Sequence, residues 1–143
     1  MKRAVLATFA AFAALLPTLG FASTLDDQLG CGVSAHDFVG SLVQQQLIDP
    51  KPMRVENNSI NAFWPTSGVD LKAFGFRVFA IVGFEKGDPM FRPGNGAPIA
   101  NSAYGAVVFG GTDKVQAEVN AAHSTAVVHH VAPHVTAIFC KRS

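Results

Sequence analysis

Two cysteines and a group of histidines are the residues of this chain whose types and spacing could do chemistry. Cysteine side chains form disulfides or reactive thiols, and imidazoles bind zinc, copper or nickel. The only cysteines among the 143 residues are Cys31 and Cys140. Four of the five histidines lie near the C-terminus, at His123, His129, His130 and His134.

The start of the chain decides how the cysteines are interpreted. Lys2 and Arg3 precede residues 4–20, which carry no charge and are rich in alanine and leucine, and small residues follow. A basic end, a short apolar run and a small-residue exit are typical of a secretory signal peptide. We expect residues 1–22 to be a signal peptide. Residues 23–143 would then be a single exported globular domain, periplasmic or secreted, that is not inserted in a membrane after cleavage.

Two cysteines in an exported chain most often form one disulfide. We therefore predict a bond between Cys31 and Cys140, near the two ends of the exported domain. Residues 29–31 resemble the end of a lipid-attachment box, but polar residues 26–28 separate them from the apolar run, which disfavours lipidation. A catalytic thiol needs an activating group nearby, and the sequence around either cysteine shows none.

The C-terminal histidines are interpreted as ordinary strand residues. A chain reversal at residues 132–133 would bring His129 and His134 together across a hairpin, and His123 could join them. However, His129 and His130 would point to opposite faces of a strand, and the run contains no carboxylate. We keep His129, His134 and His123 as weak metal candidates and expect no cofactor.

Four large side chains at strand ends or in loops are candidates for binding a partner. Trp, Tyr and Arg supply much of the energy of protein interfaces. Phe91 and Arg92 lie in residues 85–101, a segment longer than the usual connection of about 4–6 residues. Phe63 and Trp64 lie near the end of an extended segment. The alternative for each pair is that it folds back over the core, which the sequence favours for Phe63 and Trp64 and leaves open for Phe91 and Arg92.

An α+β fold is predicted to position these residues. Apolar residues repeat at helical spacing over 35–48, after Ser34 as a cap, and a second helix is expected from Thr112 or Asp113 to 122. The predicted order α-β-β-β-α-β favours a small antiparallel sheet of three to five strands, with the two helices packed on one face. Extended segments are expected over 53–65, 74–84 and 103–109, with one or two more over 126–131 and 135–140.

Two details of this prediction concern local order. Residues 23–32 are polar and contain glycine, so we expect them to form a poorly ordered lead-in. Within residues 74–84, strict alternation would place Phe76, Val78 and Ala80 on one face of a central strand.

Charge and motifs exclude several classes of function. Without Lys2 and Arg3, nine of the eleven basic residues remain against ten acidic ones, and no basic stripe appears, which argues against nucleic-acid binding. Residues 94–98 lack the spacing of a phosphate-binding loop, and no nucleophile or zinc-protease motif is present. The hydrophobic content of 49% argues against disorder.

These observations predict a small exported binding module that is not an enzyme, whose partner is another protein of the cell envelope. An inhibitor or immunity protein acting on an envelope hydrolase is one concrete form. A periplasmic metal-binding protein that uses the C-terminal histidines is one alternative. A hydrolase with an unrecognised carboxylate pair is another. The sequence leaves the oligomeric state open.

Overall fold

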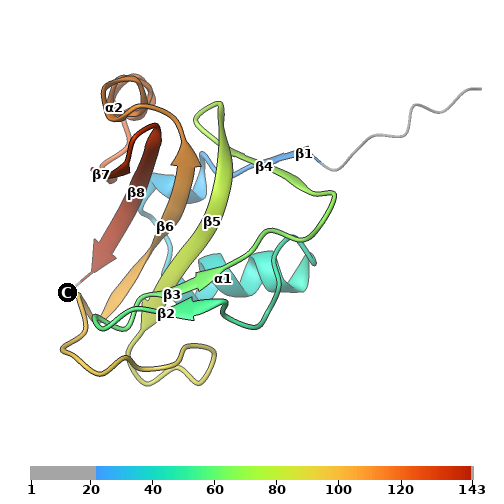
Figure 1. Cartoon of the computed structure of the whole chain (residues 1–143), viewed down its shortest axis with the longest axis vertical. Helices are drawn as coiled ribbons and strands as arrows, with labels where there is room; N and C mark the ends of the chain where they lie inside the picture. Colours follow the sequence, from blue (N-terminus) through green and yellow to red (C-terminus); the bar gives the residue numbers. More distant parts are fainter. Residues whose placement is uncertain (1–21, 143) are drawn as a thin grey trace, which may run out of the picture.

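Eight strands form one mixed sheet, and two α-helices pack against it (Figure 1). The computed structural model describes residues 22–142. The predicted signal peptide lies outside the described residues except for Ala22, as does Ser143. The elements in chain order are β1 (Ala22–Thr24), the 3-10 helix η1 (Gln28–Gly30), α1 (Ala35–Gln44), β2 (Arg54–Val55), β3 (Asn61–Phe63), β4 (Asp70–Ala73), β5 (Phe76–Glu85), β6 (Ser102–Phe109), α2 (Thr112–Ala121), β7 (Val127–Ala132) and β8 (Val135–Arg142).

The sheet is larger than predicted and is not purely antiparallel. Its strands lie in the order β1-β4-β5-β6-β8-β7, while β3 pairs with β5 and with β2. All of these pairs are antiparallel except that of β1 with β4. The prediction of three to five antiparallel strands is therefore wrong, although the α+β class is confirmed. The first four strands have only two to four residues each, too few to give a clear alternation in the sequence.

One face of the sheet, here called the covered face, carries α1. The ring centroids of Phe38 in α1 and Tyr104 in β6 are 4.7 Å apart. The helix begins as its capping pattern predicts, because the Ser34 hydroxyl accepts the backbone N–H of Asp37 at 3.1 Å. It ends before residue 48 since Gln46 has a φ of 59°, which does not continue a helix. Alternate residues of β6 and β8 share the covered face and are buried: Tyr104, Ala106, Val108, Ile138 and Cys140.

The second helix, α2, lies on the same face near the other end of the strands. Its Thr112 hydroxyl is 3.2 Å from that of Thr136, a residue of β8 that pairs with Val108 on the covered face. The predicted side-chain cap is absent from this described helix, which follows Gly111 without a capping hydrogen bond. Among residues 22–142, neither α-helix has the length and apolar character that crossing a membrane requires.

A bulge in β5 changes which of its residues share a face. Val78 pairs with Val108 and Ala80 with Val107, so Phe79 is the extra residue on β5. Val78 and Ala80 therefore point to opposite faces, and the predicted strict alternation through this strand is wrong. The extra residue is invisible to a pattern count because both faces of β5 contain apolar side chains.

The segment expected to be a poorly ordered lead-in is an ordered part of the core. Leu25 and Leu29 are buried, and β1 pairs with β4. The Asp26 carboxylate accepts the Phe74 N–H at 2.7 Å, and the Tyr104 hydroxyl donates to the Gln28 carbonyl at 2.7 Å. The prediction failed because two isolated leucines give no periodicity, although both are buried in the hydrophobic core.

The disulfide predicted from the sequence is confirmed. Cys31 and Cys140 are bonded, with a Cα–Cα distance of 5.2 Å across a sequence separation of 109. Cys140 is buried on the covered face, and Cys31 directly follows η1. The bond therefore fastens the N-terminal segment to β8.

Removing the disulfide should destabilise the fold substantially. We expect the double substitution Cys31→Ala and Cys140→Ala to lower the free energy of unfolding by about 2–5 kcal/mol, because the unfolded chain regains the freedom that the long loop closure removed. Denaturant unfolding measures this loss. Reductant should destabilise the native protein and leave the double variant unchanged. Alkylation of both cysteines without prior reduction would contradict the bond.

Gly105 allows the backbones of β6 and β8 to approach each other. A Cβ atom at this position would lie 1.9 Å from the Ile138 carbonyl oxygen, so the strands would have to separate. We expect Gly105→Ala to lower the free energy of unfolding by about 1–3 kcal/mol or more. Gly32→Ala is the matched control, because a Cβ atom there meets nothing within 4 Å. Equal unfolding midpoints for the two variants would contradict this interpretation.

Candidate functional site

The sheet face opposite the helices, here called the open face, exposes large apolar side chains. In Figure 1, α1 and η1 lie behind β5 and β6, so the view is onto this face. Monomeric proteins rarely expose contiguous apolar patches of this kind without a binding role. Four exposed large apolar residues lie on this face: Trp64 (46% exposed), Phe79 (37%), Phe109 (41%) and Val127 (44%).

The three rings and Arg77 contact one another in succession, from Trp64 to Phe79 to Phe109 to Arg77, and we call them the aromatic row. The ring centroids of Trp64 and Phe79 are 5.2 Å apart at an interplanar angle of 84°. Those of Phe79 and Phe109 are 5.5 Å apart at 77°. The guanidinium carbon of Arg77 lies 5.1 Å from the Phe109 ring centroid, within cation–π range. Phe79, the extra residue of the β5 bulge, is the central ring of the row, because it contacts both Trp64 and Phe109.

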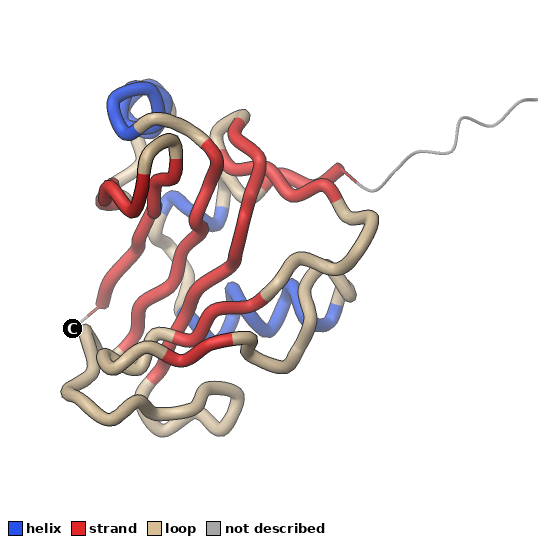
Figure 2. The backbone as a smooth tube through the Cα atoms, in the orientation of Figure 1, coloured by secondary structure: helices blue, strands red, loops and turns tan. Residues whose placement is uncertain are grey.

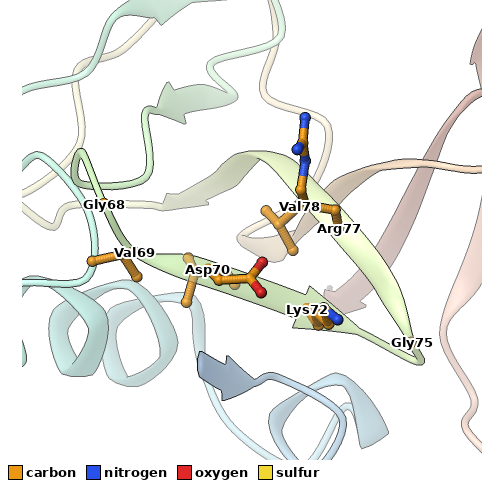
Figure 3. Close-up of a pocket in the computed structure, with 8 residues that line it drawn as sticks. Gly68, Val69, Asp70, Lys72, Gly75, Arg77 and Val78 are labelled. Carbon is orange, nitrogen blue, oxygen red and sulfur yellow. The ribbon is translucent and has the colours of Figure 1, made fainter. Parts of the chain in front are cut away.

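Two hollows lie at the ends of the aromatic row. One, of about 550 Å³, is lined by Asp70 and Lys72 of β4 and by Arg77. Figure 3 shows the Arg77 side chain pointing away from Asp70 and Lys72. The other hollow, of about 540 Å³, is more apolar and is lined by Trp64 together with Ile48 and other residues. Within residues 22–142, Arg77 makes no ion pair, so its charge is available to a ligand.

The structure revises the predicted partner-binding residues. Trp64 lies on the open face, but Phe63 is fully buried because its side chain points to the covered face opposite Ile81. Phe91 is only 5% exposed and packs against Phe63 and Phe84. Neither phenylalanine can serve as an exposed anchor in this structure. Arg92 is exposed, and its role in binding stays a prediction.

The long loop between β5 and β6 lies beside the β2–β3 hairpin (Figure 2), and hydrogen bonds with Asn61 and Ser59 fasten it there. The buried Asn61 side chain accepts the Arg92 N–H at 2.9 Å and donates to the Arg92 carbonyl at 2.9 Å. The Gly94 N–H donates to the Ser59 hydroxyl at 2.9 Å. The loop thus has a structural role, because it places Phe91 in the core, and the prediction that it is the main contact surface loses its apolar anchor.

The C-terminal histidines do not converge. His129 pairs with Ala137 and His130 with Thr136, so their side chains point to opposite faces, as predicted. The His129 ring contacts Phe139 on the open face, at a centroid distance of 6.2 Å. His130 and His134 border a different hollow beside α2. Among the described residues, no group of three possible metal ligands includes any of these histidines or His123.

A different histidine, missed in the sequence, has two carboxylates beside it. His36 of α1, Glu85 of β5 and Asp88 lie together and form what we call the His36 cluster. His36 Nδ1 is hydrogen-bonded to the Asp88 carboxylate, and this bond together with the carboxylate's negative charge raises the pKa of His36. Glu85 and Asp88 are also a carboxylate pair, the feature that the hydrolase alternative requires. The sequence gives no signal for this contact, because 52 positions separate His36 from Asp88.

Known proteins offer no guide to this arrangement. No protein-family model, curated protein or solved structure matches the chain. The function must therefore be inferred from the chemistry of the open face and of the His36 cluster.

The His36–Asp88 ion pair predicts a pH dependence. Because the pKa of His36 is raised in the folded protein, its stabilising effect is complete below the unfolded pKa of about 6.5 and is lost as the pH rises through the folded value. We expect Asp88→Asn to lower the pKa of His36, as followed by NMR, and to destabilise the fold more at pH 6 than at pH 9.

The carboxylates of Glu85 and Asp37 also raise the pKa of His36. Part of the rise in the His36 pKa should therefore remain in the Asp88→Asn variant. Asp113→Asn is the control, because Asp113 lies on α2 and is not among the groups that shift His36. A His36 pKa at its ordinary value in the unsubstituted protein would contradict the ion pair.

Proposed function

We propose that this protein is a small exported binding module, not an enzyme, that binds another protein of the cell envelope through its open face. The observation that carries the proposal is the aromatic row, in which three exposed rings and Arg77 contact one another. The exposed rings do not contribute the full free energy of burial to folding, because part of their apolar surface stays in water. A partner that covers them would recover it.

The ring geometry favours a protein partner over a carbohydrate. Flat stacking on sugars or bases requires rings that present a common plane. The rings of the aromatic row are nearly perpendicular, at 84° and 77°, and leave an uneven surface between them. Such a surface suits interdigitating side chains, and Trp and Arg are the residues that most often dominate protein interfaces.

The charges of the open face indicate the chemistry of the partner. Lys72 of β4 pairs with Arg77 of β5, whose side chain points away from Lys72 toward Phe109, and Lys141 pairs with Ala103 on the same face. Asp70 is the acidic residue that borders the hollow beside Arg77. A partner with apolar side chains flanked by carboxylates would complement this surface. An inhibitor or immunity protein that acts on an envelope hydrolase is the concrete form that we propose, with the periplasm or the exterior as its site of action.

Trp64 provides a direct readout of binding, because it is the only tryptophan of the chain and is 46% exposed. Envelope proteins captured by the purified protein should shift its emission to shorter wavelength and protect it from acrylamide quenching. We expect Phe79→Ala with Phe109→Ala to weaken such a partner by about 2–4 kcal/mol, which is roughly 30-fold or more. The double variant should remain folded, since neither side chain belongs to the buried core.

Ile99→Ala is the matched control, because Ile99 is an exposed large apolar residue on the β5–β6 loop. It should bind the partner as the unsubstituted protein does. Equal loss in both variants, or undiminished binding after the double substitution, would contradict the proposal. Retention of a purified envelope polysaccharide through the aromatic row, with no protein captured, would also overturn it.

A further inference from the structure

The His36 cluster brings one imidazole nitrogen and two carboxylate oxygens within 4.8 Å of one another. The three residues come from the first turn of α1, the end of β5 and the loop that follows. A metal ion holds nitrogen and oxygen ligands at about 2.0–2.2 Å, so the ligand atoms around it must lie close to one another. Small side-chain rotations would bring these three atoms to that distance from a shared ion. Among residues 22–142 this is the group of three donors with that spacing.

Residues outside the cluster hold its carboxylates in place. The Ser102 hydroxyl donates to Glu85 at 3.0 Å and itself accepts the Ala35 N–H at 3.1 Å. Asp88 accepts the Met90 N–H at 2.9 Å through Oδ1, while Oδ2 faces His36. Each carboxylate thus has one oxygen fixed by a neighbour, and a metal ion would replace the present hydrogen bond between Asp88 Oδ2 and His36. Outer partners that orient ligands in this way are typical of protein metal sites.

We propose that His36, Glu85 and Asp88 bind a divalent transition-metal ion, with Zn²⁺ as the representative. An imidazole nitrogen with two carboxylates suits zinc and its neighbours, whereas Ca²⁺ and Mg²⁺ prefer sites made of oxygen ligands alone. His36 is exposed, so water can complete the coordination. The site goes beyond the partner-binding function and lies at the rim of the covered face, on elements that do not contribute the aromatic row, apart from β5.

The test uses metal titration of the exported protein freed of metal by dialysis. Calorimetry with Zn²⁺ should give one site per chain, and Co²⁺ should give visible absorption bands typical of nitrogen and oxygen ligands. His36→Ala and Glu85→Gln should each weaken Zn²⁺ binding by about tenfold or more, which is the lower end of the loss seen even for outer partners. Circular dichroism should show both variants folded, because neither side chain belongs to the core.

His134→Ala is the control, since His134 is an exposed histidine far from the cluster in sequence and outside the group of three ligands. Zn²⁺ affinity should be unchanged in this variant. Lack of a stoichiometric site would show that the cluster is only an ion pair and would overturn the proposal. Loss of binding in His134→Ala, with His36→Ala unaffected, would overturn it as well. Partner binding through Phe79 and Phe109 can be measured with chelator present, so failure of one proposal does not decide the other.

Discussion

Burial of the covered face beneath α1 is the constraint on which the rest of the structure depends. Phe38, Val39 and Leu42 are all buried, and full burial of such side chains stabilises a fold by about 1.5–3 kcal/mol each. Their position requires alternate residues of β5 and β6 to point toward the helix. The disulfide adds to the same layer, because it joins the segment after η1 to Cys140 on that face.

Both candidate sites are consequences of this arrangement. Because strand residues alternate, a fully buried covered face directs the remaining side chains of β5 and β6 to the open face, where Phe79, Phe109 and Arg77 meet. At the rim of the covered face, β5 and β6 pair Glu85 with Ser102, directly beside the first turn of α1. The packing of α1 therefore brings His36 to the carboxylates without any local sequence signal.

Several features could be predicted from the sequence because they depend on residues that are close together in the chain. Ser34 and Asp37 stand at capping spacing, and the hydrogen bond between them forms. The opposite directions of His129 and His130 follow from their adjacency in a strand. The short strands, the bulge at Phe79 and the burial of Phe91 could not be read, because each depends on partners distant in the sequence. An isolated Phe in a proline-rich loop reads as exposed until Asn61 is seen to hold that loop against the hairpin.

The sequence by itself determined the α+β class, the long central strands, the capped first helix and the pairing of the two cysteines. These features depend on hydrophobic periodicity, on capping residues close in sequence and on the number of cysteines. All three can be seen in the sequence alone. Only the tertiary structure decided that Trp64 is exposed while Phe63 is buried, and that His36, rather than the C-terminal histidines, has two carboxylates beside it. Those outcomes depend on strand register and on contacts across 52 positions. A shift of one residue in register reverses the face of every side chain, and a sequence pattern does not fix it.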